Sequence, residues 1–225
     1  MGYLPHLCEP KVLADVRKEV SALVRETTDE DKRTVSTIDL ANIRTSYPIL
    51  LSTFQETLRY RTVTPGARMF LEDVLLDGRI LLKKGNILML PASVQHTNVS
   101  AWGEYVDSFD HMRFVPRPSQ RKPNTVAFRA FGGNHVLFPG RHFASTELMA
   151  LAALLVLQFD VVPVVGKLIK PTWKNSPVRA GFPIPDEDIS VKFRQRDPGR
   201  AWQVQFSGSD EAMGIVKEDV VATGG

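Results

Sequence analysis

The chain has 225 residues, of which 43% are hydrophobic and 24% are charged, and its net charge at neutral pH is +3. This is the composition of an ordinary globular protein that is long enough to bury a sizeable core. Acidic and basic residues are interleaved along the chain, which argues against a nucleic-acid-binding stripe and against a basic membrane-binding patch. The single cysteine, Cys8, excludes an internal disulfide and any metal site built from several cysteines.

The histidines and the apolar runs exclude two further classes. None of the five histidines belongs to an H-x-x-x-H or HExxH pair, so a metal site is not expected. The N-terminus carries no recognisable signal peptide, and the longest apolar run, residues 148–157, is too short to cross a bilayer. We therefore expect a cytoplasmic protein with no membrane-spanning segment and no nucleic-acid partner.

Periodicity and turn residues predict the elements in chain order. The first part of the chain contains a helix over residues 10–26, a polar connector over 27–36 and a helix over 47–60 with Ser46 as its N-cap. The middle part contains strands over 79–82 and 86–90, a short helix over 93–99 and an irregular stretch over 101–124. The last part contains a glycine-rich loop over 131–144 that leads into a helix over 145–157, and a closing hairpin of 191–194 with 202–206. Apolar residues at helical spacing indicate the helices, and Asp77-Gly78 indicates a tight hairpin turn. No internal repeat is present.

The glycine-rich loop is the most informative stretch. Gly132 and Gly133 follow Phe131, and the chain then breaks at a proline before Gly140 and continues as an apolar helix. Adjacent glycines permit backbone angles that other residues avoid, so such a loop can pack tightly against a flat surface. Phe138 is the last aromatic residue before the break.

Three stretches, in this order, resemble the motifs of cytochromes P450. Residues 56–59 fit the E-x-x-R helix, residues 109–114 fit the F-D-P-x-R-F stretch with His111 in place of the usual proline, and residues 131–144 fit the haem loop. The resemblance covers most of the chain and is greatest to fungal members. It implies an α+β, mainly α fold, the C-terminal half of a P450-like fold with small antiparallel sheets, over residues 1–207. Residues 208–225 are expected to form a flexible tail.

The resemblance also implies roles for individual residues. Glu56, Arg59 and Arg113 correspond to a structural triad that is buried in the family, and a buried carboxylate does need such partners. Arg68 lies where members often place an arginine that contacts a haem propionate; an ordinary exposed arginine is an equally good interpretation. His96 and His135 are kept as candidate assisting groups in catalysis, although nothing in their spacing singles them out.

Two departures from the family pattern stand out. Phe138 occupies the position of the cysteine whose thiolate ligates the haem iron, and a phenylalanine side chain has no lone pair. Ligation by His135 or His142 would require the loop to refold. We therefore expect no cofactor, with haem lacking cysteine ligation as the alternative. The second departure is that the chain begins where family members have completed their central helix, so we expect a truncated P450-like protein.

Several functions remain open on this basis. The first is a P450-derived protein of specialised metabolism that binds a hydrophobic terpenoid or polyketide, without redox chemistry, and promotes a cyclisation or Diels–Alder-type rearrangement by holding reactive conformers. The second is a haem-dependent monooxygenase, in which case this sequence comes from a variant or truncated gene model. The third is a non-catalytic partner of a full-length P450 or a reductase, and the fourth is a relic without function. For all of them the expected location is the cytoplasm, with the periphery of the endoplasmic reticulum as the alternative. Among enzymes, a cyclase or isomerase is favoured slightly over a monooxygenase.

Overall fold

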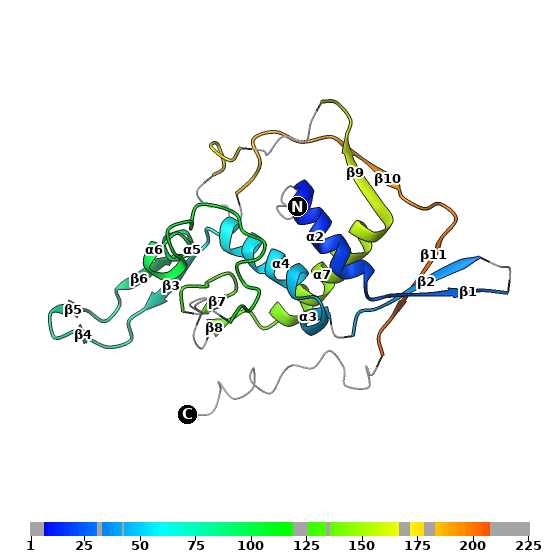
Figure 1. Cartoon of the computed structure of the whole chain (residues 1–225). Coiled ribbons are helices and arrows are strands. Elements are labelled where there is room, and N and C mark those ends of the chain that lie inside the picture. The colour runs from blue at the N-terminus through cyan, green and yellow to red at the C-terminus, as the bar shows by residue number, and fades with distance from the viewer. Residues whose placement is uncertain are drawn as a thin grey trace.

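The computed structural model describes residues 7–30, 33–41, 43–118, 126–133, 136–166, 172–177 and 183–207 (Figure 1). Its elements are α2 (Pro10–Ser21), β1 (Val24–Thr28), β2 (Thr34–Asp39), α3 (Ile43–Ser46), α4 (Pro48–Arg61), β3 (Pro65–Met69), β4 (Val74–Leu76), β5 (Ile80–Leu82), β6 (Ile87–Pro91), α5 (Ala92–His96), α6 (Val99–Trp102), β7 (Gly132–Gly133), β8 (Val136–Leu137), α7 (Arg141–Gln158), β9 (Phe159–Pro163), β10 (Val191–Gln195) and β11 (Ala201–Gln205).

Three helices, α2, α4 and α7, pack together and enclose the main hydrophobic core (Figure 1). Val12, Val16 and Val20 of α2 are four residues apart, so they share one face of the helix, and all three are buried. On α7 the buried residues include Ala152 and Ala153, whose small side chains let the neighbouring helices approach closely.

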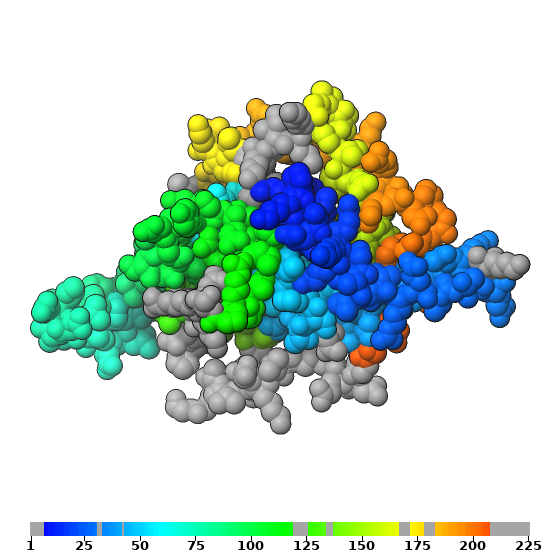
Figure 2. All heavy atoms as spheres, viewed as in Figure 1, coloured from blue at the N-terminus to red at the C-terminus, as the bar shows by residue number. Residues whose placement is uncertain are grey.

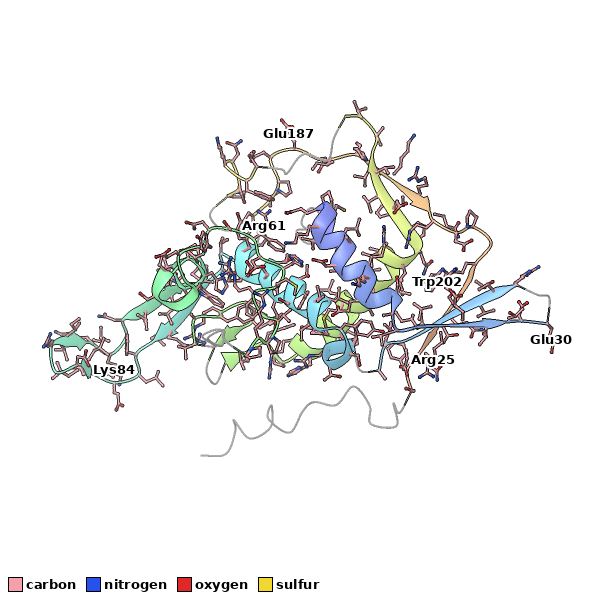
Figure 3. The ribbon with its side chains drawn as sticks, in the orientation of Figure 1. Arg25, Glu30, Arg61, Lys84, Glu187 and Trp202 are labelled. Carbon is pink, nitrogen blue, oxygen red and sulfur yellow. The ribbon has the colours of Figure 1, made fainter. Side chains whose placement is uncertain are left out.

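A long two-stranded arm projects from one side of this helical body, opposite the hairpin of β1 and β2 (Figure 2). Its inner part pairs β3 with β6 and its outer part pairs β4 with β5, both antiparallel. Asp77 and Gly78 have φ values of 52° and 65°, as a type I′ turn requires, which confirms the tight hairpin turn predicted for this dipeptide. The arm carries Lys84, whereas Trp202 lies on the other side of the body (Figure 3).

The structure confirms the α+β class with small sheets and helices that form the core. It corrects the N-terminal prediction, because the helix expected over residues 10–26 ends at Ser21 and β1 begins at Val24. The expected polar connector over residues 27–36 falls mostly within the β1–β2 hairpin. Charged side chains on exposed β1 hide the alternation there, and β2 is buried on both faces, since Val35 and Ile38 point to opposite sides of the sheet.

The predicted closing hairpin is wrong in its pairing. Residues 191–194 do form a strand, β10, but β10 pairs antiparallel with β9 at the end of α7. β11 instead adds to β2 as a parallel strand, with Trp202 opposite Ser36. Arg200, just before β11, ion-pairs with Glu26 of β1 and donates a hydrogen bond to Ser36 of β2. The chain thus passes from one sheet to another between β10 and β11, and Arg200 contacts the second sheet where β11 joins it.

Three other expectations have mixed outcomes. The short helix expected over residues 93–99 is two short helices, α5 and α6, and the described part of the irregular stretch has no strand or helix beyond α6. The tail 208–225 lies outside the described residues. The division into a 1–207 domain and a tail stays a prediction.

The N-terminus of α4 is capped by a side chain from a different helix. Ser46 ends α3 rather than capping α4, and Tyr47 at the N-cap position makes no side-chain cap, so the predicted cap is wrong. The carboxylate of Glu19 on α2 instead accepts hydrogen bonds from the backbone N–H groups of Ile49 and Leu50, at 2.7 and 2.8 Å. Burial raises the pKa of Glu19, and these two bonds oppose that rise.

We expect Glu19→Ala to lower the free energy of unfolding by about 1–3 kcal/mol, because two helix N–H groups lose their acceptor. Urea denaturation followed by circular dichroism measures this loss. The matched control is Lys11→Ala, an exposed position on the same helix, which should change stability by less than about 0.5 kcal/mol. Equal losses in the two variants would contradict the capping role.

Candidate functional site

Glu56 is the centre of a buried ion network on α4. Its two carboxylate oxygens each accept a hydrogen bond at 2.8 Å from Arg59, through Nη2 and Nε, in a bidentate arrangement. Nε of Arg113 lies 3.1 and 3.0 Å from the same two oxygens, and the backbone N–H of Asp110 donates to one of them at 3.0 Å. The structure thus brings together the three residues that the sequence groups as a triad.

Two guanidinium groups share this one carboxylate, so the triad carries one positive charge in excess. The excess charge is solvated by backbone carbonyl oxygens. Arg59 donates through Nη1 to the carbonyl oxygen of His96 at 2.7 Å. Arg113 donates, at 2.9 to 3.3 Å, to the carbonyl oxygens of Trp102, Tyr105 and Ser108. The irregular stretch is therefore held to α4 by buried charge and hydrogen bonds rather than by regular secondary structure.

An aromatic cluster covers the triad on one side. The ring of Trp102 lies 5.7 Å from that of Phe114, and Phe114 lies 5.4 Å from Phe128, both in edge-to-face geometry. The guanidinium carbon of Arg59 lies 5.6 Å from the centre of the Trp102 ring. Cation–π attraction adds to the stabilisation of the buried arginine.

His96 connects the triad to the segment that precedes the glycine loop. Its side chain is buried, and its Nε2 accepts a hydrogen bond from the backbone N–H of Arg129 at 2.8 Å. Burial, followed by the charge of Arg59, lowers the pKa of His96 to about 4; the nearby backbone of Thr62 and Arg59 opposes this shift. Nδ1 makes no hydrogen bond of normal length in the described part of the chain. The imidazole is therefore neutral at pH 7, and its hydrogen bond fixes the position of the backbone at Arg129.

Sequence reasoning missed a second histidine contact. His111, at the position where the resembled motif has proline, is buried, and its Nε2 lies 2.8 Å from Oδ2 of Asp15 on α2. The contact ties the irregular stretch that carries Arg113 to the N-terminal helix. The departure from proline was the available signal, because a polar residue in a packed stretch needs a partner.

The glycine loop forms a small hairpin ahead of α7. Gly132 has a φ of 91°, which residues with side chains rarely adopt, and the guanidinium of Arg129 occupies the place that a Cβ of Gly133 would take. The carbonyl oxygen of Phe131 accepts a hydrogen bond of 2.9 Å from the backbone N–H of Phe138. The rings of the two residues are stacked, with their centroids 6.4 Å apart. A Cβ at Gly140 would lie 3.0 Å from the Phe138 ring. This aromatic pair fills the turn from the loop into the helix.

Among its described side chains the loop offers no thiolate, and its one imidazole is that of His142. Phe138 is 52% exposed, so its position is accessible, but its side chain is a hydrocarbon. Cys8 precedes α2, and burial raises the pKa of its thiol, which is therefore protonated at neutral pH. His142, in the first turn of α7, contacts Arg44 through Nδ1. No cluster of three potential ligands occurs among the residues described.

The remaining predicted residues lie apart from this network. Arg68 is exposed on β3, where its guanidinium donates to the carbonyl oxygen of Ala67 at 2.7 Å. His135 lies outside the described residues. The propionate contact of Arg68 and the catalytic roles of His96 and His135 stay predictions. Over the part of the chain that the structure describes, no helix is both long and apolar enough to cross a membrane.

Comparison with known proteins places these features among relatives. The family model described as Cytochrome P450 matches residues 7–193. The chain is 38% identical over 194 residues to cytochrome P450 monooxygenase nodJ of Hypoxylon pulicicidum. The matched region is 83% of this chain and 38% of that protein. A cytochrome P450 monooxygenase of Gibberella zeae is 30% identical over 192 residues, covering 81% of this chain and 36% of that protein. The chain therefore spans less than two fifths of the length of these relatives.

We expect Glu56→Gln to lower the free energy of unfolding by about 3–5 kcal/mol, because two buried guanidinium groups lose the charge that compensates them. A loss of this size is comparable with the whole free energy of unfolding of a small domain. Near-ultraviolet circular dichroism therefore reports whether the variant folds, and thermal unfolding reports how stable it is. Glu147→Gln, an exposed glutamate on α7, is the matched control and should leave both readouts unchanged. A stable, cooperatively folded Glu56→Gln protein would contradict the role of the triad.

His96 should make stability depend on pH in a defined window. Its pKa is about 4 in the folded chain and about 6.5 when unfolded, so the unfolded state binds more protons between these values. Stability contributed by neutral His96 is complete above pH 6.5 and is lost as the pH falls toward 4. At pH 4.5 we expect wild type to have lost about 2–3 kcal/mol more than His96→Gln, relative to pH 7, in urea unfolding. Parallel losses would show that His96 does not titrate in this way.

Proposed function

The chain belongs to the cytochrome P450 family, and we propose that it acts in specialised metabolism by binding a hydrophobic small molecule, of terpenoid or polyketide type, without thiolate–haem redox chemistry. The observation that carries this proposal is the side chain at position 138. In the family a bound haem supplies dioxygen activation, and its cysteine thiolate ligand favours cleavage of the O–O bond. This chain has a benzyl group where that sulfur is required.

The residues at the loop do not fit a thiolate-ligated haem. Phe138 lies in the turn into α7, stacked on Phe131 and packed against Gly140. The only cysteine in the sequence, Cys8, lies before a different helix, and its thiol is held protonated by burial. No reaction step through haem is derived for this chain.

The surface beside the loop supports binding of an apolar molecule. Phe143, Leu148 and Leu151 on α7, the helix that follows Phe138, are each about half exposed, at 53%, 50% and 54%, and helical spacing places them within one half of the helix circumference. Glu147 interrupts this apolar surface. Half-exposed aliphatic and aromatic groups gain about 1 kcal/mol each when covered, which suffices for a weak apolar ligand. A pericyclic rearrangement needs bound conformers more than acid or base groups, which suits such a surface.

A second candidate function is haem-dependent monooxygenation. The names of the relatives from Hypoxylon pulicicidum and Gibberella zeae, both cytochrome P450 monooxygenases, favour it. The third candidate, a non-catalytic partner of a full-length P450 or a reductase, is favoured by the exposed apolar side chains of the arm, among them Leu71 and Ile87. Gel filtration with and without such a protein tests the third candidate.

Haem reconstitution separates the first two candidates. We expect wild type mixed with haemin to give no thiolate-type Soret band in the reduced, carbon-monoxide-bound difference spectrum, because Phe138 has no ligand atom. Phe138→Cys should give that band if the loop retains its geometry, and Phe138→Leu, which also lacks a lone pair, is the control. A thiolate-type band in wild type would refute the proposal.

Apolar binding is measured separately, by fluorescence of the neutral probe N-phenyl-1-naphthylamine. Leu151→Gln should weaken binding of this probe several-fold, since it places an amide on the proposed surface. Lys11→Gln, a polar change on another helix, should leave the affinity unchanged. Equal affinities of wild type and Leu151→Gln would remove the proposed surface.

A further inference from the structure

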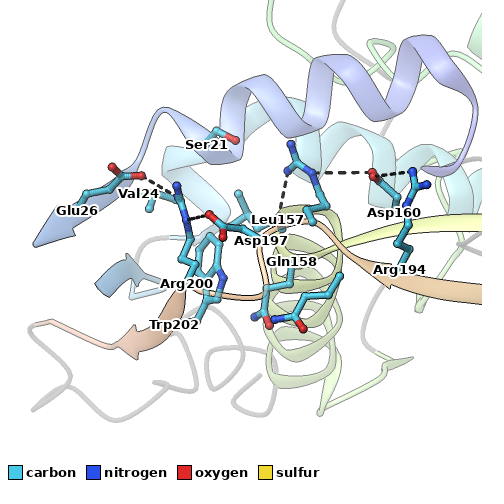
Figure 4. Close-up of a pocket in the computed structure, with 12 residues that line it drawn as sticks. Ser21, Val24, Glu26, Leu157, Gln158, Asp160, Arg194, Asp197, Arg200 and Trp202 are labelled. Carbon is cyan, nitrogen blue, oxygen red and sulfur yellow. Dashed lines mark hydrogen bonds and ion pairs between the residues drawn. The ribbon is translucent and has the colours of Figure 1, made fainter. Parts of the chain in front are cut away.

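A pocket of about 680 Å³ lies at the junction of α2, α7, β10 and the β1–β2–β11 sheet (Figure 4). Its lining includes Asp160, Arg194 and Arg196 on one side and Glu26, Asp197 and Arg200 on the other. None of its lining residues belongs to the triad or the glycine loop. The pocket falls within the size range of small-molecule sites, yet its lining is mostly polar and charged.

Three guanidinium groups surround the single carboxylate of Asp160. Arg17 lies 3.0 Å from Oδ1, Arg196 3.8 Å from the same oxygen, and Arg194 3.6 Å from Oδ2. One negative charge cannot compensate three positive charges. The carbonyl end of α7 supplies about half a negative charge more, and Arg17 and Arg196 donate to its last carbonyl groups. An excess of between one and two positive charges remains beside the pocket.

Arg194 has donor groups that nothing else in the described chain uses. Its side chain is 71% exposed, and its contact with Asp160 at 3.6 Å is longer than a normal hydrogen bond. The side-chain amides of Gln158 and Gln195 also line the pocket and make no hydrogen bond with the residues described. The arginine side of the pocket therefore combines uncompensated charge with unused donors.

The opposite side of the pocket has the reverse charge balance. There Arg200 is shared by two carboxylates, Glu26 at 2.7 Å and Asp197 at 3.1 Å (Figure 4). An excess negative charge at this side repels a second anionic group. The pocket is thus polarised, positive near Asp160 and negative near Arg200.

We propose that this pocket binds a small molecule through one anionic group, a carboxylate or a phosphate, held by Arg194 and Arg196. Guanidinium groups bind both kinds of anion with charge-assisted hydrogen bonds. The acidic pair on the other side selects against ligands with several anionic groups. The site is independent of the apolar surface on α7, so either can exist without the other.

The test is a titration of the whole chain followed by two-dimensional NMR, at constant ionic strength. The readout is the indole N–H signal of Trp202, which lines the pocket and is assigned with a Trp202→Phe variant. The probes are acetate, inorganic phosphate and the polyanion citrate. We expect saturable shifts with acetate and phosphate, with dissociation constants on the order of 1 mM, and binding of citrate no tighter than that of acetate.

Arg194→Gln should weaken this binding at least about fivefold, the loss of one charge-assisted contact. Its side chain is mostly exposed, so the fold should survive the change. Arg79→Gln on the distant arm removes the same charge and is the matched control, expected to bind like wild type. Unsaturable shifts, or equal weakening in both variants, would overturn the proposal.

A sedimentation assay separates a free ligand from a lipid headgroup as the source of the anion. Phosphatidylcholine vesicles with and without phosphatidic acid are spun down with wild type, Arg194→Gln and Arg79→Gln. Binding to the acidic vesicles that is lost only in Arg194→Gln identifies a lipid headgroup. Saturable shifts with free anions but no sedimentation identify a soluble ligand, and sedimentation that is equal in all three proteins excludes a headgroup bound at this site.

Discussion

One buried carboxylate holds together two parts of the chain that share no regular secondary structure. Glu56 lies on α4, and Arg113 reaches it from a stretch without helix or strand. Arg59 and Arg113 together carry two positive charges, and Glu56 carries one negative charge. The remaining N–H donors of the two arginines therefore need backbone carbonyl oxygens as acceptors. The path of the irregular stretch is therefore fixed by where its carbonyl oxygens must point, and the aromatic cluster around Trp102 forms on that path.

Much of the fold follows from local sequence signals. The spacing of Val12, Val16 and Val20 reveals α2, and Asp77-Gly78 reveals the arm because only a few dipeptides adopt its turn. What local signals cannot give is the partner of a strand. β11 pairs with β2 although more than 160 residues separate them, and the contacts that Arg200 makes there join segments that periodicity cannot relate. The β1–β2 hairpin was hidden for a related reason, because its exposed strand is rich in charged residues.

The candidate site was predictable only where a motif fixes both residue types and spacing. The triad could be assembled from three separated residues because their stretches resemble the motifs of a known family, and a buried carboxylate needs such partners. The Asp15–His111 contact and the link from His96 to Arg129 depend on the folded positions of segments far apart in the sequence, so no spacing rule finds them. Gly132 has its special backbone angle in this chain although position 138 offers no donor, so the loop forms without a ligand atom there.

The arm has a consequence for the life of this protein in a cell. Within the described residues its two-stranded ribbon has no further strand at either edge, and it exposes aliphatic side chains such as Leu75 and Ile80, so it offers a template for strand addition. Pairing of the ribbon with another extended chain would compete with the native fold. The tendency of this protein to associate through the ribbon is therefore set by the exposed side chains of the arm and is separate from the packing of its helical core.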